Sequence, residues 1–423
     1  MNNPDAVVIG SGPNGLVAAC VLARAGLRVL VLEANERRAG GAVGSDEGTL
    51  PGFTHDVGAA FFPWAALSPA FRDLPLEPYG LRWNRATFES CHPAPDGSYA
   101  CIARNQDVTA LHFGHPADGE RWRRVADWYA SIEPRLIDSL LGTFPAVRPV
   151  ARLGPQHLAR LTRIFLSSER ALAERWFTSG AARRVLPGLA LHADVGPDDR
   201  FGAAVGFMLG MTATTGGYAV PQGGAKSLAN ALVQCLGAYG GTLRLAARVT
   251  RVIVRNRRTA AVRLSSGEEI AARVVLADTD VSALLLDLLD RGDVPSWVAR
   301  FMHRYPRGWG TFKVDWALQS SVPWSVGPAS ESAVVHAGDS IEDLRRFTLQ
   351  VRSGVLPEHP YLVIGQQSLV DTTRAPPGRH TLWAYTHVPS KLDRGWAEAE
   401  EKFGDRIDAR IESLAPGFRS RIL

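Results

Sequence analysis

The feature that most constrains the fold lies at the start of the chain, where two apolar runs flank a glycine-rich turn and a helix-forming segment. Residues 6–9 are apolar and mostly β-branched, as in a buried parallel strand. Residues 13–25 carry the apolar faces of a helix, which Gly26 ends as a C-cap. Residues 27–32 form the second apolar run. This order predicts a strand–helix–strand unit of an open α/β sheet.

The three glycines after the first strand have separate tasks in such a unit. Gly10 makes the tight turn, Gly12 lets the backbone approach a pyrophosphate, and Gly15 lets the helix pack closely on the strand. Pro13 and Asn14 open the helix, whose first N–H groups favour phosphate. These five residues are therefore expected to hold the diphosphate of a dinucleotide.

An acidic residue closes the second strand. Glu33 follows the glycines at the expected distance, and its carboxylate is suited to accept hydrogen bonds from the hydroxyls of an adenosine ribose. The same carboxylate would repel a ribose phosphate, which argues against NADP. Because strand, glycines, helix and acid stand in the right order, the segment predicts a dinucleotide site.

A glycine pair after the acid distinguishes FAD from NAD. The segment from Glu33 and Ala34 to Gly40 and Gly41 resembles the second glycine signature of the large FAD-dependent oxidoreductase group that includes amine oxidases and phytoene desaturases. Two glycines there let the loop lie against the diphosphate and ribityl chain of a flavin, and an NAD enzyme does not need this element. The chain is therefore expected to bind FAD.

Later segments resemble further cofactor-contacting stretches of the same group. "LPGFTHDVGAA", residues 50–60, is similar to the stretch whose backbone passes the isoalloxazine. "VPQGGAKS" opens a helix at 228–236, and the strands that follow in the group touch the adenine and return to the cofactor. The positions that the resemblance assigns to the cofactor here are Asp56, Gly58, Ala59, Val249 and Ala277.

Taken together, these motifs resemble the phytoene desaturase-like FAD-dependent oxidoreductases over nearly the whole chain. Within that family the similarity is greatest to the branch that includes pyridine nucleotide-disulphide oxidoreductase domain-containing protein two, and residues 50–60, 220–232 and 359–389 carry it. Carotenoid desaturases and amine oxidases have Arg after the glycine pair, whereas this chain has Ala42, as that branch does. Ala42 belongs to the implied cofactor site, and its identity makes carotene desaturation less expected.

The resemblance also implies a C-terminal strand, Gly-rich loop and helix that close the FAD site. No Gly-rich cofactor loop follows Gly224 in the sequence. We therefore expect either a fragment or a site that is open on the ribityl side, and we favour a fragment because an open site would enclose the cofactor poorly. Such a fragment is expected to bind FAD weakly or to be inactive.

The fold class is expected to be α/β, with a discontinuous Rossmann-type FAD-binding domain and an inserted α+β substrate domain. The FAD-binding domain is assigned to residues 1–105 and 216–290, a helical insertion to 106–215, and the second part of the substrate domain to 291–423. Substrate is then expected in a cavity between the two domains, over the flavin.

Apolar periodicity predicts the elements of the remaining chain. Helical spacing covers 125–140, where Pro134 is expected to break or kink the helix, and continues through 158–176. The other predicted elements are a hairpin of 242–254 with 260–264, a buried strand at 270–277, a buried uncharged helix that runs into a glycine-rich loop within 201–225, strands at 311–318, 361–368 and 381–388, and an amphipathic helix at 402–414.

Composition excludes several other classes of protein. The net charge of +5 is dispersed without a basic cluster, so no nucleic-acid partner is expected. The four cysteines form no Cys-x-x-Cys motif, which argues against a redox dithiol and a metal site. A strand begins within the first residues, leaving no room for a signal peptide. We expect a cytoplasmic, bacterial protein without membrane association, and its oligomeric state stays open.

The expected reaction passes a hydride from a small-molecule substrate to flavin N5, which needs no side-chain acid or base. His55 lies beside the predicted flavin loop and is a candidate for proton transfer, but loop packing is favoured. Lys226 is a candidate for a flavin-proximal role, against plain exposure to solvent. Trp309, Trp316 and Trp383 are interpreted as core residues, with cavity lining as the alternative.

Three functions stay open at this stage. The first is an FAD oxidoreductase with an apolar or amphipathic substrate. The second is a carotenoid-type desaturase at a membrane surface, for which residues 157–184 would be the basic amphipathic face. The third is a flavin-binding or partner-binding module without catalytic turnover. No second dinucleotide motif and no cysteine pair accompany the first, so a disulphide reductase is poorly supported.

Overall fold

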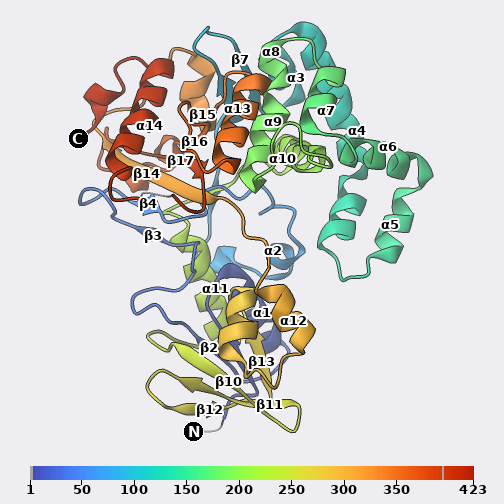
Figure 1. Ribbon diagram of the computed structural model, residues 1–423, viewed down its shortest axis with the longest axis vertical. Coiled ribbons are helices and arrows are strands. Elements are labelled where there is room, and N and C mark those ends of the chain that lie inside the picture. The colour runs from blue at the N-terminus through green and yellow to red at the C-terminus, as the bar shows by residue number, and fades with distance from the viewer. Residues whose placement is uncertain (1–2, 393–394) are drawn as a thin grey trace.

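A parallel four-stranded sheet forms around the N-terminal strand in the computed structural model, which describes residues 3–392 and 395–423. Its strand order is β13-β1-β2-β9, with β1 (Ala6–Ile9) between β2 (Val29–Leu32) and β13 (Val274–Ala277). The fourth strand, β9 (Thr242–Arg244), pairs with β2. Helices α1 (Pro13–Arg24) and α11 (Lys226–Ala238) pack side by side on this sheet (Figure 1). The expected Rossmann-like α/β fold is confirmed.

A second, antiparallel sheet of β10 (Val249–Arg255), β11 (Arg258–Leu264) and β12 (Glu269–Ala271) lies beside the first. The predicted single strand 242–254 is wrong, because Ala246 has a left-handed φ of 53° and the chain there leaves the parallel sheet. The predicted strand 270–277 also divides in two, since a bend at Arg273 carries the chain from β12 into β13.

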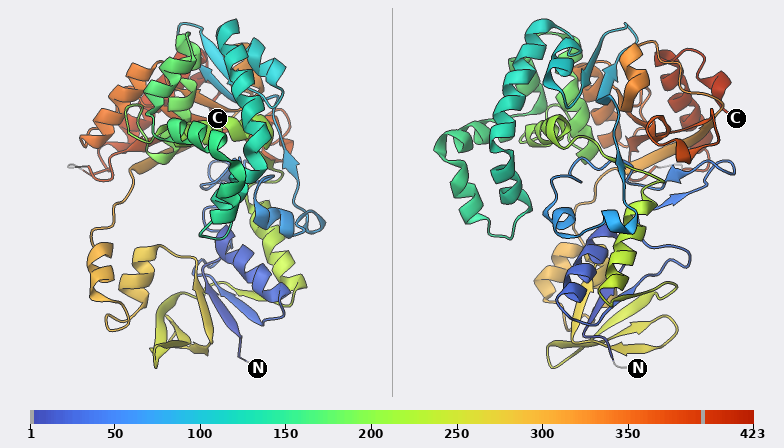
Figure 2. Two further views of the ribbon diagram at one scale, coloured as in Figure 1. Left: turned by 90° about the vertical axis from the view of Figure 1, so that its right-hand side faces the viewer. Right: turned by 180° about the vertical axis from the view of Figure 1, so that it is seen from behind.

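The other lobe is built on a mixed six-stranded sheet with the order β14-β17-β16-β15-β6-β7 (Figures 1 and 2). Its strands are β14 (Gly310–Leu318), β17 (His380–Val388), β16 (Leu362–Gly365), β15 (Ser332–Ala337), β6 (Phe88–Pro93) and β7 (Tyr99–Ile102). Residues 88–102, assigned above to the FAD-binding domain, thus join the sheet of the other lobe, because β6 pairs with β15 in parallel.

Alternation along these strands gives the six-stranded sheet two apolar faces. On one face Val335, Ile364 and Ala384 pack against α14 (Glu400–Leu414), the amphipathic helix predicted at 402–414. On the other face their neighbours Val334, Val363 and Trp383 pack toward the helical part of the chain. Helix α13 (Ile341–Arg352) joins the same cluster through Phe347. The functional cavity described below lies on this second face.

Eight helices between residues 106 and 215 form the helical region. They are α3 (Gln106–Leu111), α4 (Pro116–Leu141), α5 (Val147–Leu153), α6 (Pro155–Phe165), α7 (Glu169–Trp176), α8 (Gly180–Arg183), α9 (Val185–Ala190) and α10 (Ala203–Thr215). Helix α4 runs through Pro134 without the expected break, because Pro134 and Ala130 one turn earlier lie on the exposed face, where water can solvate the freed carbonyl.

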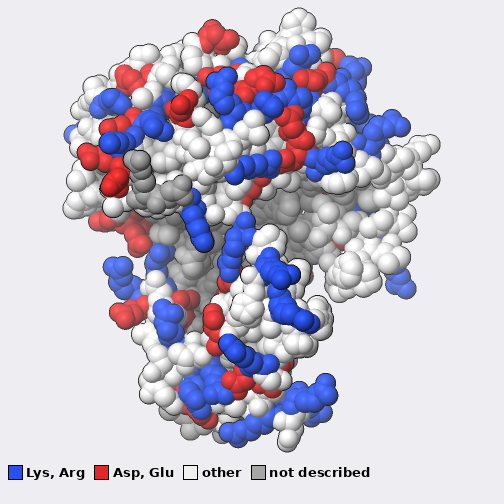
Figure 3. All heavy atoms as spheres, viewed as in Figure 1, with Lys and Arg blue, Asp and Glu red and all other residues white. Residues whose placement is uncertain are grey.

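Short elements complete the chain. They are β3 (Ser45–Asp46), β4 (His55–Asp56), α2 (Pro69–Asp73), β5 (Trp83–Asn84), β8 (Val220–Pro221) and α12 (Ser296–Met302). Within the described ranges, no helix is both long and apolar enough to span a bilayer. Basic and acidic side chains are interspersed over the face seen in Figure 3, as the dispersed charge of the sequence predicted.

Candidate functional site

The glycine-rich turn forms a narrow cradle at the first turn of α1. A Cβ atom added to Gly12 would lie 2.4 Å from Oδ2 of Asp278, and one added to Gly15 would lie 2.7 Å from the carbonyl oxygen of Gly10. Gly10 itself has a φ of +93°. Oδ2 of Asp278 accepts a hydrogen bond of 2.9 Å from the Gly15 N–H. The start of α1, with Pro13 at its first position, therefore binds an anionic oxygen, as its dipole and free N–H groups favour.

Glu33 lies at the carboxyl end of β2, beside this cradle. Its Oε2 atom accepts from both the N–H and the hydroxyl of Ser11, at 2.9 and 2.5 Å, and Oε1 accepts from the Asn35 N–H at 2.8 Å. Burial would raise the pKa of Glu33, but these hydrogen bonds outweigh it and hold the pKa below its ordinary value. Oε1 keeps a lone pair for a further donor, such as a ribose hydroxyl.

The glycine pair lies against the cradle. The Gly40 N–H donates to the Ser11 carbonyl at 2.9 Å, and a Cβ added to Gly41 would lie 3.7 Å from the Cα of Gly12. Ala42 accepts a hydrogen bond from the Ala59 N–H at 3.0 Å, so it anchors the loop predicted to pass the isoalloxazine. Gly58 of that loop would contact Ala42 at 3.1 Å if it carried a Cβ atom.

Other predicted cofactor positions lie close to these elements. Val249 begins β10, is buried, and shares an apolar cluster with Ile9 and Leu32. Ala277 pairs with Ile9 at the end of β13. Asn14 lies in the first turn of α1, and Ala34 follows Glu33 at an exposed position. Contact of any of these residues with FAD stays a prediction.

Asp56 is fully buried and bonded within the protein. Its Oδ1 atom accepts from the Ser45 hydroxyl and the Ala225 N–H, both at 2.7 Å. Its Oδ2 atom accepts from Arg374, which also donates to Asp371 at 2.9 Å. Because Asp56 is held on both oxygens, its contact with a flavin would come from the backbone, as the motif implies.

The two weak catalytic candidates occupy different environments. His55 is 4% exposed, its Nε2 atom lies 2.8 Å from the Thr49 hydroxyl, and Nδ1 lies 3.3 Å from the Asp315 carboxylate. Asp315 also binds the ammonium of Lys313. Burial would raise the pKa of Asp315, but His55 and Lys313 together lower it. Lys226 begins α11 with an exposed side chain and does not line the cavity described next.

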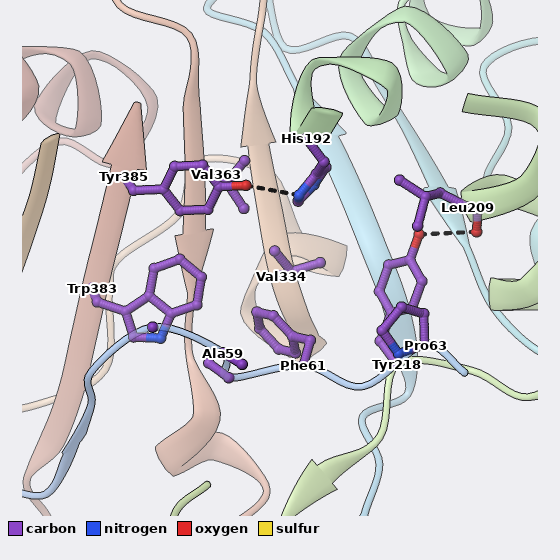
Figure 4. A pocket seen from close by; sticks show the side chains of 12 residues that line it. Ala59, Phe61, Pro63, His192, Leu209, Tyr218, Val334, Val363, Trp383 and Tyr385 are labelled. Atoms are coloured by element: carbon purple, nitrogen blue, oxygen red, sulfur yellow. Dashed lines mark hydrogen bonds between the residues drawn. The ribbon is translucent and has the colours of Figure 1, made fainter. Parts of the chain in front are cut away.

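A cavity of about 240 Å³ begins where the Gly58–Ala60 segment passes the second face of the six-stranded sheet (Figure 4). Phe61 and Trp383 bound one side, and the tilt between their rings is 53° at a centroid distance of 5.6 Å. The lining consists of Gly58, Ala59, Ala60, Phe61, Pro63, His192, Leu209, Tyr218, Val334, Val363, Trp383 and Tyr385. None of these lining residues is acidic or carries a permanent charge, so the cavity suits an apolar or weakly polar guest.

Four lining residues carry polar groups, namely His192, Tyr218, Tyr385 and Trp383, whose indole N–H has no hydrogen-bond partner among the described residues. The hydroxyl of Tyr385 lies 2.8 Å from Nδ1 of His192, and the hydroxyl of Tyr218 donates to the Leu209 carbonyl at 3.1 Å (Figure 4). Nε2 of His192 lies 2.8 Å from Nε2 of His336, behind the cavity wall. Burial, with a smaller effect of nearby His387, lowers the pKa of His192 to about 4. His192 is therefore neutral around neutral pH.

Sequence reasoning named part of this site. Trp383 lines the cavity, whereas Trp316 is a core residue, and Trp309 is partly buried against the apolar cluster that contains Trp383. Tyr385, His192 and Asp278 were missed. Tyr385 follows Trp383 by two positions on one strand, and this spacing was the available signal that it shares the cavity face.

The arrangement fits FAD. The adenosine diphosphate portion of FAD requires three features that the site has. The glycines leave a cradle that side chains would fill, and the start of α1 binds an anionic oxygen. The Glu33 carboxylate keeps a spare lone pair for the ribose. The cavity starts at the loop predicted to pass the flavin ring. The Asp278 carboxylate accepts from the Gly15 N–H, which is one of the donors at the start of α1 that favour phosphate.

Known proteins resemble this chain over almost its whole length. Pyridine nucleotide-disulfide oxidoreductase domain-containing protein 2 of Mus musculus is 25% identical over 468 residues, covering 99% of this chain and 80% of that protein. The neurosporene-forming phytoene desaturase of Cereibacter sphaeroides is 24% identical over 446 residues, with coverages of 99% and 80%. Both confirm the resemblance stated from the motifs.

Solved structures share the fold. An oxidoreductase from Methanosarcina mazei has a TM-score of 0.64 at 16% identity, covering 99% of this chain and 85% of that one. A putrescine oxidase triple mutant has a TM-score of 0.62 at 17% identity, with coverages of 99% and 83%. The model of the family described as flavin containing amine oxidoreductase matches residues 14–318. The chain therefore belongs to the flavin containing amine oxidoreductase family and is an FAD-dependent oxidoreductase.

Proposed function

We propose that this protein is a dehydrogenase that takes hydride from a small apolar or amphipathic molecule held in the cavity beyond Gly58–Ala60. The observation that carries the proposal is the position of that cavity, between the loop assigned to the flavin and the second face of the six-stranded sheet. Its lining supports an uncharged reacting group, because a buried charge without a partner is expensive.

In this proposal the residues of the first lobe hold the cofactor and those of the second hold the substrate. Gly12, Gly15 and the start of α1 bind the diphosphate, Glu33 binds the ribose, and Gly41 lies along the chain toward the flavin. When bound, FAD supplies a two-electron acceptor. Phe61 and Trp383 exclude water from the cavity and orient an apolar substrate.

All four cysteines are buried thiols, which supports a cytoplasmic location.

The experiment has two stages. Absorbance bands near ~370 and ~450 nm, the oxidised-flavin signature of a cofactor enzyme, are expected in the protein after FAD is added and removed by gel filtration. The matched variant Gly12→Val is expected to lose them, because its side chain fills the cradle. Gly292→Val is expected to keep them, because Gly292 is exposed, has no atom within 4 Å of an added Cβ and has no left-handed φ. Substrates are then added without oxygen, and bleaching of the flavin bands identifies those that are oxidised. A wild-type protein without flavin bands contradicts the proposal.

A second candidate is desaturation of a long polyene, which the phytoene desaturases among the relatives favour. The cavity argues against it, since about 240 Å³ lies below the roughly 300–1,000 Å³ of sites for drug-sized ligands. Phytoene in detergent micelles is the discriminating substrate. Bleaching by phytoene alone would select the desaturase, and bleaching by small molecules alone would select the dehydrogenase.

A further inference from the structure

We infer that Tyr385 and His192 form the proton acceptor of the cavity, and that the substrate is an apolar molecule with a hydroxyl group on the carbon that is oxidised. The inference rests on the proposed dehydrogenase function and specifies its substrate class. It is carried by a continuous hydrogen-bonded chain that starts at the cavity and ends inside the second lobe.

The chain has five members from four separate parts of the sequence. The Tyr385 hydroxyl lies 2.8 Å from Nδ1 of His192, and Nε2 of His192 lies 2.8 Å from Nε2 of His336. Nδ1 of His336 lies 2.9 Å from the Ser90 hydroxyl, which lies 2.9 Å from Nε2 of His92. The rings of His92 and His336 stack at 4.5 Å with an angle of 9°. Every contact is therefore within normal hydrogen-bond length.

Each link in this chain needs one donor and one acceptor, so the protons can be arranged in two uniform directions. In the first, Tyr385 donates to His192, His192 donates to His336, and His336 donates to Ser90. All histidines are then neutral, and the Tyr385 oxygen has a free lone pair toward the cavity. In the second, every bridging proton has moved by one link, and the Tyr385 hydroxyl points into the cavity.

The difference between the two directions is the movement of one proton away from the cavity. When a hydroxyl-bearing carbon is oxidised, its C–H bond breaks and the electron pair leaves as hydride to the bound FAD, which is reduced. The O–H bond breaks at the same carbon, a C=O bond forms, and the proton passes to the Tyr385 oxygen. The proton of Tyr385 moves to Nδ1 of His192, and each bridging proton moves by one link, through His336 and Ser90, so that the excess proton ends on Nε2 of His92. Atoms and electrons balance with FAD as the oxidant.

The polar groups of the cavity favour an alcohol over two other substrate classes. A neutral imidazole can accept a hydroxyl proton as hydride leaves, but it is too weak a base for the proton of an unactivated carbon. An alkylammonium substrate would bring a charge that a buried carboxylate pairs best, and no acidic residue is among those that line the cavity. The apolar remainder, with Phe61 and Val363, accommodates a hydrocarbon skeleton.

The groups around the chain keep it neutral. His387 is near His192, and its Nδ1 atom lies 3.0 Å from the Asp194 carboxylate. The charge of Arg184, which immediately precedes α9, adds to burial in lowering the pKa of His92. Burial, with smaller contributions from Arg184 and from the other histidines of the chain, lowers the pKa of His92 and His336 well below the ordinary value. Because His192 accepts a proton only when neutral, flavin reduction by an alcohol is expected to stay constant as pH falls, until it declines near the His192 pKa of about 4.

The test uses the FAD-loaded full chain and cyclic alcohols from cyclohexanol to cyclododecanol, with the matched amines and hydrocarbons. The alcohols are expected to bleach the flavin without oxygen. Tyr385→Phe and His192→Gln are expected to slow this step by about 100-fold or more, the range of general acid–base catalysis, with little change in alcohol affinity. His192→Gln preserves hydrogen-bonding atoms but cannot take up a proton.

Tyr99→Phe is the matched control. The Tyr99 hydroxyl lies 3.2 Å from Nδ1 of His112, so this variant also removes a tyrosine–histidine bond, but outside the cavity. Its rate is expected to equal that of the wild type. Equal rates for Tyr385→Phe and Tyr99→Phe would overturn the role of Tyr385.

The substrate outcomes separate this inference from the proposed function. Bleaching by an amine or a hydrocarbon but not by the alcohols would overturn the alcohol inference and leave the dehydrogenase in place. Bleaching by none of the three substrate classes would contradict both the alcohol inference and the proposed function.

Nitrogen NMR of protein labelled at histidine gives a readout that needs no turnover. His192 and His336 are each expected to show one protonated nitrogen, and Tyr385→Phe is expected to change the His192 pattern. Two rapidly exchanging tautomers in the wild type would overturn the ordered chain.

Discussion

Replacement of Arg374 by methionine tests a buried ion-pair network that joins distant segments of the chain. Arg374 is 1% exposed and bonds Asp56, Asp371 and the Pro221 carbonyl. Asp371 also accepts from the Gly223 N–H at 2.7 Å. The guanidinium therefore ties three segments together: the loop leading to the flavin, the turn before α11, and the turn before β17.

The expected cost follows from burial. Both carboxylates are buried, so Arg374→Met leaves two uncompensated charges, and breaking a buried ion pair costs about 3–5 kcal/mol. At about 2 °C per kcal/mol for a large domain, the melting temperature should fall by about 6–10 °C. Arg374→Lys keeps the charge but loses the planar guanidinium that reaches both carboxylates, so its melting temperature should lie between those of the wild type and Arg374→Met.

Thermal unfolding with and without FAD measures both stability and cofactor retention. Arg379→Met is the matched control, because Arg379 is exposed five positions later and makes one weak contact of 3.4 Å to the Gln319 carbonyl. Its melting temperature should match the wild type. We also expect Arg374→Met to release FAD more readily, since Asp56 positions the Gly58–Ala60 segment. Equal melting temperatures for the two methionine variants would refute the reasoning.

Three further perturbations probe the cofactor cradle and a buried acid. Glu33→Gln should weaken FAD binding about tenfold, the equivalent of one charge-assisted hydrogen bond of about 1.4 kcal/mol, while exposed Glu36→Gln leaves the dissociation constant from flavin fluorescence unchanged. Asp278→Asn should tighten FAD binding about two- to fivefold and lower the melting temperature of the FAD-free protein, because it removes a charge worth about 0.3–1 kcal/mol at the start of α1. Weaker FAD binding by this variant would contradict a competition between Asp278 and the diphosphate for the Gly15 N–H. Burial raises the pKa of Glu169 to about 8, so the folded protein holds a proton that the unfolded chain releases above about 4.5, and stability should fall as pH rises between these values. Glu169→Gln should flatten this slope in melting temperature against pH, and an unchanged slope would show that other groups cause it.

Local patterns made the cofactor half of the fold predictable. The β1–α1–β2 unit and its glycines occupy one continuous segment, where burial, turn and helix preferences agree. The prediction failed at 242–254 because apolar alternation does not show which sheet a strand joins. That choice depends on hydrogen bonds from Ala246 and Ala247 to the distant residues Asn35 and Glu33.

The histidine chain behind the cavity could not be predicted from the sequence for a similar reason. His92, His192 and His336 lie far apart in the chain, on β6, after α9 and on β15, and none has a neighbour that marks it as functional. The pairing of β6 with β15 brings His92 and His336 together, and His192 reaches His336 from the helical region. Asp278 was missed because its contact, the Gly15 N–H, is 263 positions away.

The central position of β1 in its sheet has a consequence for biosynthesis. Its partner β13 begins 268 positions after it. At about 5–20 residues per second, the ribosome needs roughly 13–54 s to make that partner. During this time one edge of a fully apolar strand stays without its hydrogen-bonding neighbour, and such edges pair readily with other chains. The nucleotide cradle is therefore completed late, and the nascent chain should be a good client for chaperones that bind extended apolar segments.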